Sequence, residues 1–170
     1  MSAIPENYWK FIAPLITTAR GFLENGESLA AIAFVGSFSS GTCIPVLLQP
    51  SSIESKDRSA LAIKTTANTL GADFIFVIME AWSLRKDKVL QMDAILDKYG
   101  SIGASPYAVD VVSMALETRH GVWMAEVPIK RKGISKKKRT IGPPEFRHFT
   151  EFEGRFVNLL PKKDEAATLH

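Results

Sequence analysis

The sequence predicts a single α/β domain, with a mixed sheet of about five strands and helices on both faces of the sheet. Residues 72–82 are apolar at both odd and even positions, which is typical of a central strand covered on both sides. Two stretches with an apolar spacing near 3.6 precede this strand and predict helices. Two long stretches that follow it predict a β-hairpin.

The first half of the chain is predicted to alternate helix and hairpin. Its elements are a helix at residues 4–25, strands at 29–38 and 44–49, and a helix at 56–70. Pro14 lies inside the first helix, where it predicts a kink or a division in two. Pro45 cannot donate a hydrogen bond to a ladder, so the second strand is expected at an edge of the sheet. Ser52 or Ser55 is expected to cap the second helix, and Gly71 to end it.

The second half is predicted to contain the central strand, a third helix and the hairpin. These elements cover residues 72–82, 87–99, 108–118 and 122–131, with Gly121 at a positive φ in the turn. Residues 145–160 are left open between helix and strand. The spacing of Phe146, Phe149, Phe152 and Phe156 fits a helix, but Gly154 and Asn158 weaken that interpretation. The domain is expected to span residues 1–160, followed by a polar tail at 161–170.

Composition restricts the class of protein. The single cysteine, Cys43, rules out an intrachain disulfide and a multi-cysteine zinc site, and it fits a reducing compartment. The apolar runs are too short for a membrane-spanning helix, and no secretory signal pattern precedes the first helix. We therefore expect a soluble, cytoplasmic protein without membrane contact.

A basic run is the strongest feature that folding alone does not explain. Residues 130–139 contain seven cations and no acid: Lys130, Arg131, Lys132, Lys136, Lys137, Lys138 and Arg139. The chain has a net charge of +3, so the rest of it carries −4. Such a run at the end of a hairpin is suited to nucleic-acid phosphates or to an acidic protein surface. The alternative interpretation is a solvated loop.

A second hypothesis concerns carboxylates near the ends of two strands. If strands 72–82 and 108–118 were parallel neighbours, Glu80 and Glu117 would meet at one edge of the sheet, close to Trp82 and His120. Such a cluster suits general acid–base catalysis of a hydrolase type. The alternative is that these carboxylates only mark places where the strands reach water.

Other catalytic patterns are absent from the sequence. Residues 36–41 are rich in glycine and serine, but they lack the Lys-Ser/Thr ending of a P-loop and precede a strand, so a plain turn is expected. No Gly-x-Ser-x-Gly nucleophile elbow occurs, and Cys43 is expected to be a small buried residue. We predict neither a cofactor nor a metal.

The order helix, hairpin, helix, strand, helix, strand resembles that of the cytidine-deaminase-like fold over residues 4–116. Catalysis in that family needs a His/Cys-x-Glu motif and a Pro-Cys-x-x-Cys motif. The corresponding places are residues 53–57 and 83–87, and neither contains a histidine or a cysteine, so zinc-dependent deamination is excluded.

The chain also resembles small uncharacterised α/β proteins of bacteria and phages. These carry a strand that ends in Glu-Ala-Trp, here residues 80–82, and a later Glu-Thr-x-x-Gly hairpin, here residues 117–121. This resemblance implies no activity.

The sequence therefore favours a non-enzymatic binding protein that uses its basic loop, with the hydrolase as the second hypothesis. A homodimer formed through the edge strand or through residues 146–156 is a third possibility.

Overall fold

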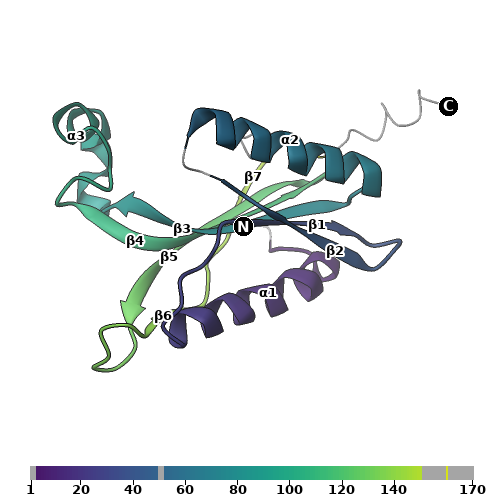
Figure 1. The fold of residues 1–170 in the computed structure, drawn as a ribbon, viewed down its shortest axis with the longest axis horizontal. Coiled ribbons are helices and arrows are strands. Elements are labelled where there is room, and N and C mark those ends of the chain that lie inside the picture. The colour runs from purple at the N-terminus through teal and green to yellow at the C-terminus, as the bar shows by residue number, and fades with distance from the viewer. Residues whose placement is uncertain (1–2, 50–51, 151–159, 161–170) are drawn as a thin grey trace.

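The computed structural model describes residues 3–49, 52–150 and 160 of the 170-residue chain. Its elements are α1 (Glu6–Glu24), β1 (Ile32–Ser37), β2 (Thr42–Leu47), α2 (Ile53–Leu70), β3 (Phe74–Leu84), η1 (Lys86–Gln91), α3 (Met92–Tyr99), β4 (Ala108–Thr118), β5 (Gly121–Arg131), β6 (Arg139–Ile141) and β7 (Arg147–Phe149). The strands form one antiparallel sheet in the order β2-β1-β3-β4-β5-β6, with β7 paired to β5. The sheet curls into a half-barrel (Figure 1).

The two long helices cover opposite faces of the sheet, as the sequence predicts (Figure 1). On the face that α1 covers, Ile12 and Leu23 of the helix pack with Phe76 and Met114 of the central strands. On the face that α2 covers, the core is a second cluster: Ala33, Val35, Leu48, Ile63, Ala67, Ala72, Ile75 and Val77. The strand β3 lies between these clusters, which explains why its residues are apolar on both sides.

Several local predictions for the first half are confirmed. Ser52 caps α2, because its hydroxyl accepts a hydrogen bond from the Ser55 amide at 3.1 Å. Gly71 ends that helix with a φ of 63°. Pro45 lies in β2, which is an edge strand. Pro14 lies inside α1, and the helix continues through it from Glu6 to Glu24 without dividing.

The prediction of a mixed sheet is wrong, because every pairing between the described strands is antiparallel, including that of β3 with β4. A parallel β4 would require the third helical segment to return the chain along a face of the sheet. Instead, η1 and α3 form a small lobe beyond the end of β3, from which the chain turns back as β4 (Figure 1). Only Ile95 of the lobe is buried, so the other apolar side chains of this segment do not cover the sheet. The predicted count of about five strands is too low, because β6 and β7 have three residues each and show no readable alternation.

The strand β5 leaves the main sheet before it ends. Its pairing with β4 stops at Val111 opposite Pro128, and from Ile129 onward it pairs with β6 instead. Pro128 has no N–H for a ladder, which suits the place where the two strands separate. Residues 129–141 thus form a two-stranded projection, called the basic arm below, which lies beside the C-terminal end of α1 (Figure 1).

The ambiguous region after the arm begins as a strand. Residues Arg147–Phe149 form β7, where His148 stacks on the buried indole of Trp123 at a centroid distance of 4.2 Å. Phe152, Phe156 and the predicted tail at 161–170 lie outside the described residues. Among the described helices, none combines the length and the apolar character needed to cross a membrane.

Candidate functional site

The structure gives Glu80 a structural role at the base of the basic arm. This carboxylate lies on the α1 face, where its Oε1 accepts a hydrogen bond from Arg139 at 2.7 Å. Its Oε2 accepts a second hydrogen bond from the backbone N–H of Leu29 at 2.9 Å. One side chain of β3 therefore connects the α1–β1 loop to the arm, and both of its oxygens are occupied by these contacts.

The proposed cluster of Glu80, Glu117 and His120 does not form. In the antiparallel register Glu117 lies opposite Ile75, on the α2 face, five residues along β3 from Glu80. That offset corresponds to about 17 Å at the usual strand rise. His120 lies in the β4–β5 turn, and its carbonyl accepts a hydrogen bond from the His148 ring at 2.8 Å. Because the three side chains do not converge, the geometry offers no shared acid–base site.

Other catalytic groups are also poorly placed. Cys43 is half-buried in the edge strand β2, and this burial raises the pKa of its thiol. The thiolate is the reactive form, so a raised pKa is the opposite of what a nucleophilic cysteine needs. Within the described part of the chain, no group of three or more His, Cys, Asp or Glu residues could hold a metal ion.

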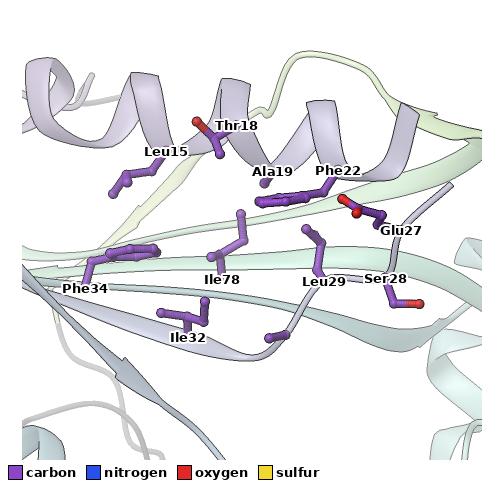
Figure 2. Close-up of a pocket in the computed structure, with 11 residues that line it drawn as sticks. Leu15, Thr18, Ala19, Phe22, Glu27, Ser28, Leu29, Ile32, Phe34 and Ile78 are labelled. Carbon is purple, nitrogen blue, oxygen red and sulfur yellow. The ribbon is translucent and has the colours of Figure 1, made fainter. Parts of the chain in front are cut away.

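A pocket of about 420 Å³ opens between α1 and the strands β1 and β3 (Figure 2). Leu15, Phe22, Phe34 and Ile78 point into it, so its wall is mainly apolar. The Thr18 hydroxyl is directed away and donates to the Pro14 carbonyl at 2.9 Å. The lining therefore suits an apolar group and contains no pair of groups for proton transfer.

The basic arm carries a dense group of cations that have no acidic partner among the described residues. Two of its seven cations have acidic partners: Lys132 pairs with Glu24 at 3.3 Å and Arg139 with Glu80 at 2.7 Å. The other five are exposed and make no ion pair with the described part of the chain: Lys130, Arg131, Lys136, Lys137 and Lys138. The arm thus presents five cations to solvent on a framework held by two ion pairs.

The C-terminal end of α1 also contacts the arm. Glu24 accepts a hydrogen bond from the Thr140 hydroxyl at 2.8 Å in addition to its ion pair with Lys132. Arg20, one helical turn earlier, donates from Nε to the Ile141 carbonyl at 3.0 Å. The Ile141 side chain is buried in the core beneath α1. The base of the arm is therefore fixed by packing as well as by charge.

The loop at the end of the arm, residues 132–138, is closed by its own hydrogen bonds. The Lys132 amide donates to the Lys138 carbonyl at 2.9 Å. The Ser135 hydroxyl accepts from the amides of Lys137 and Lys138 at 3.3 and 3.2 Å. Gly133 adopts a φ of 63°, a conformation that favours glycine. These contacts indicate a defined loop conformation, in which Lys136, Lys137 and Lys138 are exposed.

Acidification is expected to weaken the contact between the arm and α1. The hydrogen bond from Thr140, then that from Lys132, lowers the pKa of Glu24 below the ordinary value of 4.5. Because the folded-state pKa is lowered, the stabilisation from this contact is complete above pH 4.5 and is lost as the pH falls through the folded value. Hydrogen exchange of the Thr140 and Ile141 amides, corrected for its intrinsic pH dependence, should accelerate in that range. In Glu24→Gln this acid-dependent step should be missing; if it persists unchanged, another group controls the arm.

Sequence reasoning found the cations of the arm but missed its anchors. Glu24 and Glu80 lie 116 and 59 residues from their partners Thr140 and Arg139, so no local pattern connects them. Ile134 was also missed. A signal for it was visible in the sequence, since it is the only large apolar residue between Lys130 and Arg139. Its side chain is fully exposed, at 101%.

The comparisons with known proteins define no family. No protein-family model matches the chain, and no curated protein and no solved structure matches it. We therefore infer a function from the geometry and charge of the chain itself.

Proposed function

We propose that the protein binds nucleic acid without catalysing a reaction, and that the basic arm contacts the phosphate backbone. The observation that carries this proposal is the set of five exposed cations that lack acidic partners among the described residues, on an arm with a fixed base. Phosphate contacts by lysine and arginine supply most of the affinity in non-specific nucleic-acid binding.

Anchoring distinguishes this arm from an ordinary solvated loop. Lysine side chains on a mobile loop lose chain entropy when they bind, and that loss reduces the affinity. Here Glu24 and Glu80 hold the two sides of the arm, and the Lys132–Lys138 hydrogen bond closes its loop. Much of the backbone ordering is therefore complete before a ligand arrives.

The charge distribution favours a polyanion over a small anion. The described cations of the arm do not converge on one point, since Lys130 and Arg131 lie on β5 while Lys136, Lys137 and Lys138 lie on the loop. Consecutive phosphates of a nucleic-acid backbone supply negative charges that are spread in the same way. An acidic protein surface is the alternative partner, and the presence or absence of binding to DNA and RNA at low salt separates the two.

Charge reversal on the arm is expected to remove most of the binding. In Lys136→Glu/Lys138→Glu, affinity for a short DNA duplex should fall roughly 50-fold at low salt, because two phosphate contacts are lost and replaced by repulsion. The slope of log K against log salt should be about −4 to −5 for the wild type and smaller by about 2 for the variant. Fluorescence anisotropy with a labelled duplex, at several salt concentrations, measures both quantities.

The matched control is Arg58→Glu/Lys64→Glu on the exposed side of α2. It changes the net charge from +3 to −1, as the arm variant does, but it leaves the arm intact. Equal losses in the two variants would mean that net charge alone governs binding, and they would contradict the proposal. Absence of wild-type binding to DNA and RNA at low salt would also contradict it, and would direct attention to an acidic protein partner.

A further inference from the structure

We propose that Ile134 acts as an apolar wedge, which the basic arm inserts between base pairs of duplex DNA so that binding bends the DNA. This inference rests on the proposed function and names its ligand as a double helix. Ile134 lies in the turn at the tip of the arm, with its side chain 101% exposed. Isoleucine is one of the side chains that minor-groove binders insert between base steps.

The tip holds Ile134 outward. Gly133 turns the chain with a φ of 63°, and the Ser135 hydroxyl binds the amides of Lys137 and Lys138 on the returning side. The isoleucine thus occupies the apex of a hydrogen-bonded loop. Its side chain branches at Cβ and has few rotamers, which makes it a stiff wedge.

A wedge must be held rigidly, and contacts at the base of the arm hold it in this way. Separating stacked bases costs free energy, and a loosely held loop would move aside before it opened a base step. Glu80 holds Arg139 on β6, and Glu24 holds Lys132 at the start of the loop. The buried side chain of Ile141 anchors the end of the arm in the core.

The chemistry of the tip favours duplex DNA over two other ligands. Binding of single strands relies on aromatic side chains that stack on bases, and the loop at residues 132–138 has no aromatic residue. Insertion into a lipid surface would bury only one apolar side chain from this tip, which contributes little membrane affinity. In a duplex, by contrast, the lysines on both sides of Ile134 would contact phosphates flanking the groove.

The test is a short duplex that carries a donor and an acceptor fluorophore at its two ends. Wild-type protein should raise energy transfer, and Ile134→Ala should abolish that rise and weaken binding about tenfold. On a duplex with a central mismatch, which bends easily, the difference in affinity should shrink to about twofold, because less unstacking is required. Ile134→Met should restore much of the bending.

Leu90→Ala is the matched control, because Leu90 in η1 is also fully exposed, at 102%, and lies outside the arm. It should bind and bend DNA as the wild type does. If Ile134→Ala also behaves like the wild type, while Lys136→Glu/Lys138→Glu loses binding, the wedge is refuted and the proposed function stands. If neither variant differs from the wild type, both proposals fail.

Two further results would contradict the proposal that Ile134 acts as a wedge. One is tighter binding to a single strand than to the duplex of the same length. The other is binding to vesicles of phosphatidylcholine and phosphatidylserine that depends on Ile134, together with DNA binding that does not. That second result would assign the tip to a lipid surface.

Discussion

Replacement of Gly36 by alanine is expected to destabilise the protein by about 3 kcal/mol, the largest effect of any single substitution considered for this fold. Gly36 lies in β1 directly opposite Phe74 of β3, and a Cβ at position 36 would overlap the Phe74 ring. Phe74 is fully buried, and the rings of Tyr8, Phe11 and Phe38 surround it at centroid distances of 5.4–6.0 Å. The ring cannot move aside without disturbing the aromatic core beneath α1.

Chemical denaturation of a double-mutant cycle measures this effect. With Phe74→Leu as the background, the ring is absent and Gly36→Ala should cost about 1 kcal/mol, so the two substitutions should be strongly coupled. Gly21→Ala in α1 is the matched control, because a Cβ there meets no atom within 4 Å. It should stabilise the helix by roughly 0.5–1 kcal/mol. A small cost for Gly36→Ala in the wild-type background would contradict the described packing of β1 against β3.

The second large effect is expected from loss of the Glu80 side chain, which binds both Arg139 and the Leu29 amide. Glu80→Ala should reduce the free energy of unfolding by about 2 kcal/mol, because it removes charged hydrogen bonds to Arg139 and to the Leu29 amide. The side chains of Glu80 and Arg139 are only about a quarter exposed, so water replaces these contacts incompletely. Hydrogen exchange of the amides at residues 139–141 should accelerate, and affinity for a DNA duplex should fall even though every cation of the arm remains.

Two variants distinguish the loss of the Glu80 contacts from the loss of one negative charge in general. Glu126→Ala on β5 removes an exposed carboxylate that accepts only from the Ser83 hydroxyl at 2.8 Å among the described residues, and it should change stability by less than about 0.5 kcal/mol. Glu80→Gln keeps an acceptor for Leu29 but loses the charge, so its effect should be intermediate. If Glu80→Ala leaves both stability and exchange in the arm unchanged, then Glu80 does not position the arm.

Much of the fold could be predicted because its signals are local. The spacing near 3.6 identified α1 and α2, the cap at Ser52 and the stop at Gly71 located the ends of α2, and continuous apolarity identified β3 as central. The basic run was equally visible, because seven cations among ten residues need no partner to be recognised. Each of these features depends on residues that are close in the chain.

The direction of β4 could not be predicted in the same way. The segment that became η1 and α3 has helical spacing, and that pattern does not say whether a helix returns along the sheet or remains at its end. Burial decides between these outcomes, and only Ile95 of this segment is buried. The error in strand direction then produced the error in the site, because a parallel β4 would have brought Glu117 to the same edge as Glu80.

The sequence by itself determined the helices, the long strands and the charge that this protein presents to a ligand. The tertiary structure decided which acids hold the basic arm, where Ile134 points, and that Glu80 and Glu117 lie on opposite faces. The physical reason is the range of the interactions. Helix periodicity and strand alternation arise from neighbouring residues, whereas the Glu80–Arg139 contact joins residues 59 apart and depends on the folded sheet to bring them together.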